Sequence, residues 1–355
     1  MTDLDERIVQ TLRDRAEGTV DTDRLLVGAV RRGRTRVRRR RVSAGATLGV
    51  IALLGAGVVA GPLGGLPGLG PTVTPGSAET TVAFLPPLVA GAPGAAARPD
   101  QIGKDPALLH IGLAPGGSRF LEWNVGGGRE TAKIDVGGRT VTVELTSAEL
   151  LRTIGAWTPP PVEGLPGNPY DGTVAHADGP DGVPIWRRYW QPTPGVYAAA
   201  SVSGPDESPL YEAAAALRLD RAYGCAGPVR LTDLPAGVQF ATCSMVVGTF
   251  PAAYAVMLRV SDDQGRGVTV EFQYAGTTLM AKAPANRMID GRPAYYDPAH
   301  DTAYDPAVAR LELLDIPRAQ LFTALNHELS LSEADATTVL LGVRVAEHLD
   351  RPATW

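Results

Sequence analysis

The residue types that most often perform catalysis or bind metals are sparse in this 355-residue sequence. An acidic loop from Asp297 to Asp305 offers oxygen ligands for a cation, but we interpret it as a solvated Pro-rich loop. No nucleophile elbow, P-loop or Rossmann glycine pattern occurs, and Gly126-Gly127-Gly128 is typical of a hairpin tip. The histidines have no i, i+4 spacing that would place two zinc ligands on one helix. We therefore predict no catalytic residue, no metal ligand and no cofactor. The five histidines are His110, His176, His300, His327 and His348.

Cys225 and Cys243 are the only cysteines, and 18 positions separate them. Both lie after residue 61, in the part of the chain that is expected below to be exported. An even pair there is typical of a disulfide, with a redox pair, a metal site or free thiols as the alternatives. On the chain-entropy model, closing such a loop contributes about 3 kcal/mol to stability. We predict a disulfide that ties a turn-rich joint to the strand that follows it.

Trp186, Tyr189 and Trp190 form an aromatic group that flanks Arg187 and Arg188. Aromatic rings of this kind can stack on flat ligands such as sugar rings. Core packing with one exposed edge explains the same residues and is the interpretation we favour. A ligand-stacking patch is the alternative.

These groups belong to a chain whose character changes at residue 42. Eight of the eleven residues from 31 to 41 are arginine, and the next 20 residues, 42–61, are almost wholly apolar. A helix of that length matches the hydrocarbon core of a bilayer, about 30 Å. Arginines beside such a helix hold that end in the cytoplasm. The orienting residues are Arg31, Arg32, Arg34, Arg36, Arg38, Arg39, Arg40 and Arg41.

The sequence thus predicts a single-pass protein of the plasma membrane, with a cytoplasmic N-terminus and an extracytoplasmic C-terminal domain. A cleaved signal peptide is the alternative, although 41 residues before the apolar run exceed an ordinary n-region. Residues 42–61 would contact membrane lipid, and the GxxxG spacing of Gly45 and Gly49 would allow a homodimer. The arginine run has no interleaved aromatic residues, which argues against nucleic-acid binding.

Residues 1–41 predict two short helices. Leu4, Ile8 and Leu12 recur at helical spacing in the first, and Leu25 and Leu26 belong to the second. So few residues bury little core, and their apolar side chains need the membrane surface, the other helix or a protein partner. A juxtamembrane hairpin is the simpler interpretation. Docking of a cytoplasmic regulator on residues 1–30 is the alternative.

Residues 62–99 are rich in Gly and Pro and predict a tether. From about residue 100 the apolar pattern alternates as in strands, and two stretches share one plan. RTVTVEL at 139–145 resembles RGVTVEF at 266–272, and each follows a Gly-containing turn that predicts a hairpin. A Gly-x-Pro turn, a strand and a helix follow in the same order each time. We therefore predict an internal duplication, with ectodomain repeats at 100–220 and 221–355.

The clearest helix of the ectodomain is the last one. Ser332 and Asp335 form a near capping box, and apolar residues follow at helical spacing. Each repeat would lay one such helix on an antiparallel sheet. The predicted fold class is α+β, with N-terminal helices and one transmembrane helix, then a tandem of two antiparallel-sheet-plus-helix units. The predicted apolar face of the last helix holds Val339, Leu340, Val343, Ala346 and Leu349.

The order of these segments resembles a known kind of protein. A helical start reading LDERIVQTLRDRAEG, an arginine block, one apolar helix, a tether, and an ectodomain with DLPAGV and GRPAYY are similar to actinobacterial single-pass envelope proteins. The layout also resembles transmembrane anti-sigma factors and ectodomains of the RseB or LolA kind. Residues 1–41 contain no His or Cys, so the zinc site of zinc-binding anti-sigma factors is absent from them.

These observations predict a membrane-anchored protein that presents a non-catalytic extracytoplasmic domain for binding or sensing an envelope ligand. One alternative is an anti-sigma-like transmembrane regulator that acts through residues 1–41. The other is an envelope hydrolase, which would need catalytic side chains assembled by folding alone.

Overall fold

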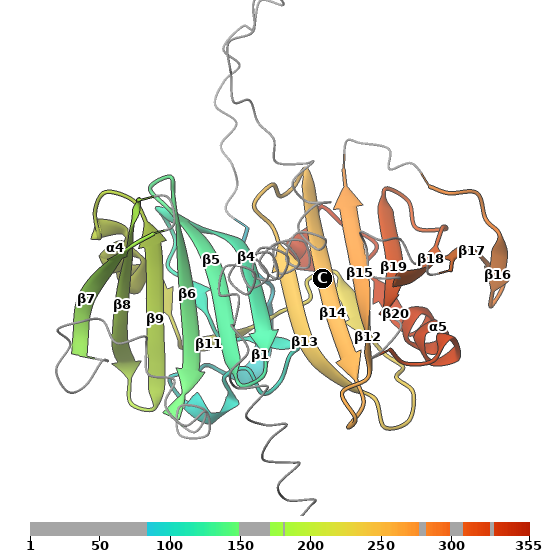
Figure 1. The fold of residues 1–355 in the computed structure, drawn as a ribbon, viewed down its shortest axis with the longest axis horizontal. Helices are drawn as coiled ribbons and strands as arrows, with labels where there is room; N and C mark the ends of the chain where they lie inside the picture. The colour runs from blue at the N-terminus through green and yellow to red at the C-terminus, as the bar shows by residue number, and fades with distance from the viewer. Residues whose placement is uncertain (1–83, 149–170, 180–181, 277–281, 299–307, 327–329) are drawn as a thin grey trace, which may run out of the picture. The chain divides into compact units, whose positions relative to one another are not determined.

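The structure is a computed structural model that describes residues 84–148, 171–179, 182–276, 282–298, 308–326 and 330–355. Among these residues, thirteen strands form one large antiparallel sheet (Figure 1). The order is β16-β17-β18-β19-β15-β14-β13-β4-β5-β6-β9-β8-β7. The first half contains β4 (Ser118–Gly126), β5 (Arg129–Val136), β6 (Arg139–Ser147), β7 (Asp171–Asp178), β8 (Pro184–Thr193) and β9 (Val196–Ser203). The second half contains β13 (Gln239–Val246), β14 (Ala253–Ser261), β15 (Gly267–Ala275), β16 (Arg287–Ile289), β17 (Arg292–Asp297), β18 (Val308–Leu313) and β19 (Ala319–Asn326).

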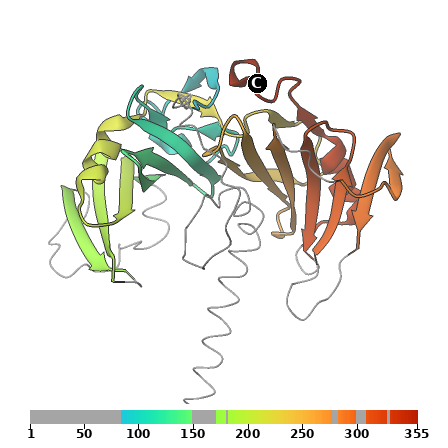
Figure 2. The ribbon, with the colours of Figure 1, turned by 90° about the horizontal axis from the view of Figure 1, so that it is seen from above.

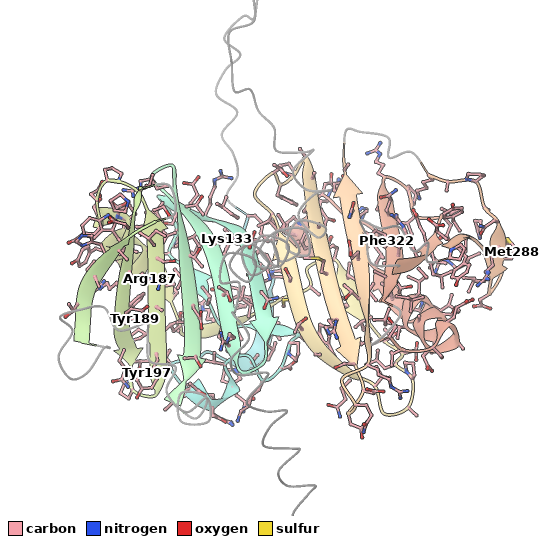
Figure 3. The ribbon with its side chains drawn as sticks, viewed as in Figure 1. Lys133, Arg187, Tyr189, Tyr197, Met288 and Phe322 are labelled. Carbon is pink, nitrogen blue, oxygen red and sulfur yellow. A yellow bond between two sulfur atoms is a disulfide. The ribbon has the colours of Figure 1, made fainter. Side chains whose placement is uncertain are left out.

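The strands form where apolar and polar side chains alternate, because alternate residues of a strand point to opposite faces of the sheet. In β6, Val141, Val143 and Leu145 are fully buried. Thr142 and Glu144, which lie between them, are partly exposed. The side formed by the buried residues is called here the core face. The opposite side is called the polar face; Figure 3 labels Lys133, Arg187, Tyr189, Tyr197 and Phe322 on it.

Two α-helices and three small sheets among the described residues cover the core face (Figure 2). Helix α4 (Ser208–Ala216) packs on β5, β6, β8 and β9, and helix α5 (Glu333–Leu341) packs on β15 and β19. Their buried side chains join the core of the large sheet. The small sheets are β1 (Leu88–Pro93) with β11 (Arg221–Gly224) and β2 (Leu108–Leu109), β3 (Gly112–Leu113) with β10 (Leu217–Arg218), and β12 (Val229–Leu231) with β20 (Val343–Val345). Two 3₁₀ turns complete the described elements, η1 (Pro99–Gln101) and η2 (Pro352–Thr354).

The two halves of the large sheet have the same connectivity. Counted outward from the central pair, β4-β5-β6-β9-β8-β7 corresponds to β13-β14-β15-β19-β18-β17. The register shifts between Phe120 and Glu122 in the β4–β5 pair, and between Phe240 and Thr242 in the β13–β14 pair. The halves meet where Asn124 of β4 pairs antiparallel with Ser244 of β13. Positions in one half can therefore be compared strand by strand with positions in the other.

The predicted fold class is wrong. The described chain is mostly β, with two short helices, and both predicted repeats, 100–220 and 221–355, contribute strands to one continuous sheet instead of forming two separate α+β units. The boundary between those repeats stays a prediction. The last helix is also shorter than predicted, because it ends at Leu341 and Val343–Val345 pairs with β12 as a strand.

The prediction of a single-pass membrane protein is not upheld by this structure. In the part of the chain that the structure describes, no helix is long and apolar enough to cross a membrane. Helices α4 and α5 have nine residues each. They would span about 14 Å of the roughly 30 Å needed. The predicted N-terminal helices, the arginine block and the apolar segment 42–61 lie outside the described residues.

Candidate ligand-binding pocket

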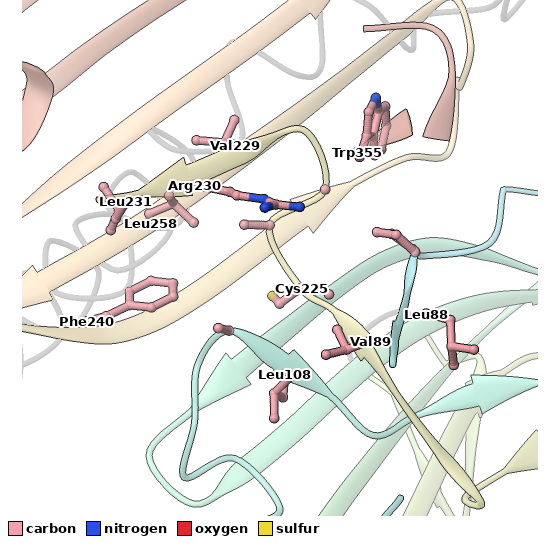
Figure 4. A pocket seen from close by; sticks show the side chains of 15 residues that line it. Leu88, Val89, Leu108, Cys225, Val229, Arg230, Leu231, Phe240, Leu258 and Trp355 are labelled. Carbon is pink, nitrogen blue, oxygen red and sulfur yellow. The ribbon is translucent and has the colours of Figure 1, made fainter. Parts of the chain in front are cut away.

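A pocket of about 500 Å³ opens on the core-face side, between the small sheet of β1, β2 and β11 and strands β12, β13 and β14 (Figure 4). Its walls are almost wholly apolar, and its size falls in the range of pockets that hold small molecules. The lining residues are Pro87, Leu88, Val89, Ala107, Leu108, Gly224, Cys225, Ala226, Gly227, Val229, Arg230, Leu231, Phe240, Leu258 and Trp355.

The backbone around Cys225 organises this pocket. The N–H of Gly224 donates to the carbonyl of Pro87 (2.7 Å), and the N–H of Cys225 donates to the carbonyl of Ala107 (2.9 Å). The indole Nε1 of Trp123 donates to the carbonyl of Cys225 (2.9 Å). Three separate segments are thus joined at the adjacent residues Gly224 and Cys225, which positions the side chains of the wall.

Gly227 is a glycine for a packing reason. Its φ is +55°, and a Cβ there would lie 2.9 Å from the Sδ of Met245 and 3.0 Å from the ring of Trp355. A side chain would therefore crowd the core residue Met245 and the pocket-lining ring of Trp355, and it would strain the backbone.

The structure contains the disulfide Cys225–Cys243 that the sequence predicted. Both sulfurs belong to fully buried residues, and the bond links the pocket wall to β13. Such a bond fits an oxidising compartment better than the reducing cytosol.

An aromatic cluster closes one end of the pocket. The ring of Trp355 lies 5.6 Å from that of Phe84 and 5.5 Å from that of Tyr254, between ring centroids. The Tyr254 hydroxyl donates to the carbonyl of Leu349 (2.9 Å), and the Trp355 indole donates to the carbonyl of His348 (2.9 Å). Burial raises the pKa of Tyr254, so its hydroxyl stays protonated and acts as a donor. The last described turn is thereby fixed against the pocket.

The lining of the pocket is apolar apart from one charged side chain. Arg230 is the only charged side chain among the lining residues, and it is exposed at the rim. The lining residues include no acid, histidine, serine or lysine, and the cysteine is held in the disulfide. An apolar chamber with one guanidinium at its rim favours a ligand that has an apolar body and one anionic group.

Beside the pocket wall lies a buried hydrogen-bonded pair that the sequence analysis missed. His110 and Glu130 are both fully buried, and His110 Nδ1 lies 2.6 Å from Glu130 Oε1. The N–H of Gly103 donates to the same oxygen (3.2 Å), and the N–H of His110 donates to Oε2 (2.6 Å). Because a carboxylate only accepts, the ring proton belongs on Nδ1. Glu130 on β5 thus holds the segment that includes Leu108 of the pocket.

The sequence analysis predicted no metal ligand, and the structure describes only some of the histidines and acidic residues that it considered. Among the described residues there is no group of three His, Cys, Asp or Glu side chains that could hold a metal. The ring of His176 lies against Trp186, at 4.7 Å between centroids. His300, His327 and the acidic loop beyond Asp297 lie outside the described residues.

The predicted aromatic patch is divided between two faces of the sheet. Trp190 belongs to the apolar core, whereas Tyr189 lies on the polar face, buried to 3% exposure (Figure 3). Trp186 donates its indole N–H to the carbonyl of Gly204 (2.9 Å). Arg188 lies between the rings of Trp190 (5.2 Å) and Tyr211 of α4 (4.7 Å). The three predicted rings therefore share no single surface.

The polar face carries a partly buried carboxyl at the same position in each half, Glu144 and Glu271, and these two groups give a pH prediction. Burial raises the pKa of Glu144 on β6 and of Glu271 on β15, while Arg129 and Arg310 respectively lower them in part. A raised pKa favours the protonated acid in the folded state. The stability that this contributes is complete below pH of about 4.3 and is lost as pH rises through the folded-state value.

Glu144→Gln and Glu271→Gln should therefore both raise the free energy of unfolding at pH 7 relative to the parent chain, and the gain should vanish below about pH 4. Urea unfolding between pH 3.5 and 8 measures this. Asp206→Asn is the control of opposite sign, since hydrogen bonds from Ser208 lower the pKa of Asp206. Its loss of stability should be present at pH 7 and disappear in acid. A pH-independent effect of the glutamine variants would contradict the prediction.

Comparison with known proteins gives little further guidance. No protein-family model matches the sequence, and no curated protein matches it. Among solved structures, "Crystal structure of MucB in complex with MucA(peri)" is similar to 65% of this chain and 93% of that chain, at 11% identity and a TM-score of 0.23. At that TM-score the match defines neither the fold nor the function of this chain.

Proposed function

We propose that residues 84–355 form a non-catalytic binding domain, and that its pocket takes an amphipathic molecule with an apolar body and one anionic group. The observation that supports this is the pocket of about 500 Å³ with apolar walls and Arg230 as its single charged lining residue. Burial of the apolar body supplies the affinity. The guanidinium orients the ligand by pairing with its anionic group at the rim.

We also propose that the domain works outside the cytoplasm, where it would bind or sense an envelope ligand. The buried disulfide Cys225–Cys243 supports this location, since disulfides persist in oxidising compartments. The bond lies in the pocket wall, so an oxidising environment would also preserve the shape of the binding site.

Titration of the full chain with dodecanoate, followed by tryptophan fluorescence, tests the pocket. Because Trp355 lines it, saturable binding should change the emission, and Trp355→Phe should remove that change. Dodecanol, which has the same apolar body but no charge, should bind about tenfold or more weakly. Arg230→Gln should bring the affinity for dodecanoate down to that for dodecanol.

A matched pair of variants controls for folding. Leu88 and Leu85 are exposed to 55% and 52%, but only Leu88 lines the pocket. Leu88→Asp should abolish dodecanoate binding by placing a carboxylate in the apolar chamber, whereas Leu85→Asp should leave it intact. Equal effects of the two substitutions, or equal affinity for dodecanol and dodecanoate, would overturn the proposal.

A further inference from the structure

Four polar side chains form a row across adjacent strands on the polar face of the first half. The ladder pairs Lys133 of β5 with Thr142 of β6, Thr142 with Ser201 of β9, and Ser201 with Arg187 of β8. Directly paired residues on one face have neighbouring Cβ atoms. At about 4.8 Å per strand, the row extends over roughly 14 Å, with a cation at each end and two hydroxyls between them.

A hollow lies along the part of this row that β5, β6 and β9 contribute, and Arg187 of β8 is not among its lining residues. It has a volume of about 370 Å³ and includes Lys133, Thr142 and Ser201. Its lining contains two basic residues and four hydroxyls, with no carboxylate among them. The remaining lining residues are Arg139, Thr140, Ile185, Val202 and Ser203.

Among the basic side chains of this row and its surroundings, one arginine has no carboxylate partner within the described chain. On this face, Arg119 pairs with Asp135 (3.0 Å), Arg129 with Glu144 (3.5 Å) and Lys133 with Glu122 (2.7 Å). Arg139, at the end of the hollow, pairs with Asp206 (3.1 Å). Arg187 has no such carboxylate among the residues that the structure describes. The cation at the open end of the row is thus available to an anion.

The second half provides an internal comparison, because the arginine at the end of its corresponding row already pairs with a carboxylate. The ladder there pairs Arg259 with Thr269, Thr269 with Ala324, and Ala324 with Arg310. One hydroxyl of the first-half row is therefore replaced by a methyl group.

Arg310, the counterpart of Arg187, is already occupied. It donates to Glu312 (2.8 Å), which is 3% exposed, and its guanidinium lies 3.7 Å from the centre of the Phe322 ring. By register, Tyr189 and Ala199 stand at these two positions in the first half. Neither can neutralise Arg187. The row of the first half therefore ends in an arginine without a described carboxylate partner and is called here the open row, whereas the corresponding arginine of the second half is already paired.

We propose that the open row is a second binding site, which takes a tetrahedral oxyanion such as a phosphate group. Arg187 and Lys133 supply the charge, with the guanidinium able to donate two parallel hydrogen bonds. The Thr142 and Ser201 hydroxyls lie between them and donate to the remaining oxygens. The Lys133–Glu122 pair is partly exposed, with 41% and 34% of the two side chains accessible, so exchange of Glu122 for a ligand costs little. This site lies on the face opposite the pocket and is independent of the proposed function.

Calorimetric titration of the full chain with inorganic phosphate, at low ionic strength in a chloride buffer, tests the site. Arg187→Gln should weaken binding about tenfold or more, since it removes a charge-assisted donor pair. Thr142→Val and Ser201→Ala should each weaken it by a few fold. Arg259→Gln and Thr269→Val in the second half should leave the affinity unchanged, as should Arg230→Gln in the pocket.

Glycerol 3-phosphate distinguishes free phosphate from a phosphate ester. Tighter binding of the ester would assign the site to a phosphorylated molecule, and tighter binding of inorganic phosphate would assign it to the free ion. Thermal unfolding of each variant separates lost binding from lost folding, and the two hydroxyl variants supply the test if Arg187→Gln does not fold. The proposal is overturned if the parent chain shows no saturable binding, or if second-half substitutions weaken binding as much as first-half ones.

Discussion

Glu130→Ala should destabilise the folded protein by about 3–5 kcal/mol, which is among the largest losses expected for any single side chain of this domain. The variant leaves His110 and two buried backbone N–H groups, those of Gly103 and His110, without their acceptor. Buried donors that lose a charged partner retain the full cost of their desolvation. Urea or thermal unfolding of the full chain, monitored in the β-sheet signal, measures the loss.

Two further variants define the origin of that loss. Glu122→Gln removes a carboxylate of a partly exposed pair on the same sheet and should cost about 0–1 kcal/mol. Glu130→Leu combined with His110→Leu should recover part of the loss, because it removes both buried polar side chains but still leaves the backbone N–H groups of residues 103 and 110 unpaired. A loss below about 1 kcal/mol for Glu130→Ala would show that the pair contributes little to stability.

Glu130→Ala should also lower the affinity of the pocket for its ligand. Glu130 fixes the segment from Gly103 to His110, and this segment includes Ala107 and Leu108 of the pocket wall. Loosening that wall should therefore lower the affinity for dodecanoate even under conditions where the sheet remains folded. Phosphate binding on the opposite face should be unaffected, which separates a local effect from a global one.

The strand pattern was largely predictable from the sequence. The segments RTVTVEL and RGVTVEF lie within β6 and β15, and the Gly-rich turn at 126–128 joins β4 to β5, as alternation and turn chemistry indicate. The capping residue Ser332 was also found, since its side chain accepts the N–H of Asp335 (3.1 Å). These features depend on residues close together in the chain.

The fold class could not be read from the same patterns. Val343 and Ala346 continue the helical spacing of α5, but after Gly342 the chain forms β20 (Val343–Val345) and pairs with β12. Helical and strand periodicities agree over so short a run, and a partner more than 100 positions away decides between them. Similarly, the pairing of β4 with β13 joins the two predicted repeats into one large sheet.

The candidate sites depend on contacts that no local signal encodes. His110 and Glu130 are 20 positions apart, and their pairing requires β5 to lie beneath the segment from Gly103. The sequence analysis searched for histidines spaced as metal ligands, and such a search does not find a histidine whose partner is a carboxylate. The row from Lys133 to Arg187 is visible only when three ladder registers are known.

Trp123→Ala should cost about 3–5 kcal/mol, comparable to the loss of Glu130. The side chain is 1% exposed, packs on Phe84 and Phe120 with ring centroids 5.8 Å and 5.4 Å away, and donates to the carbonyl of Cys225. Trp123→Phe should cost less, about 1–3 kcal/mol, because it keeps most of the apolar contact but orphans a buried carbonyl. Denaturant unfolding under oxidising conditions measures both.

Trp123 also has a counterpart that makes its role testable. By strand register, Trp123 of β4 corresponds to Cys243 of β13, and both hold Cys225, one by a hydrogen bond and the other by the disulfide. Each half of the sheet thus contributes one attachment to the same pocket residue. Replacing both cysteines by serine should cost about 3 kcal/mol on the chain-entropy model.

The two attachments should be coupled in a double-mutant cycle. Trp123→Phe combined with the cysteine replacements should differ from the sum of the separate losses by about 0.5–3 kcal/mol, since both changes act on one shared partner. Dodecanoate affinity should fall further in the combined variant than in Trp123→Phe alone or in the cysteine replacements alone. In the combined variant, residue 225 has lost both the hydrogen bond and the disulfide that attach it to the large sheet. Strict additivity in both measurements would mean that the two halves hold the pocket wall independently.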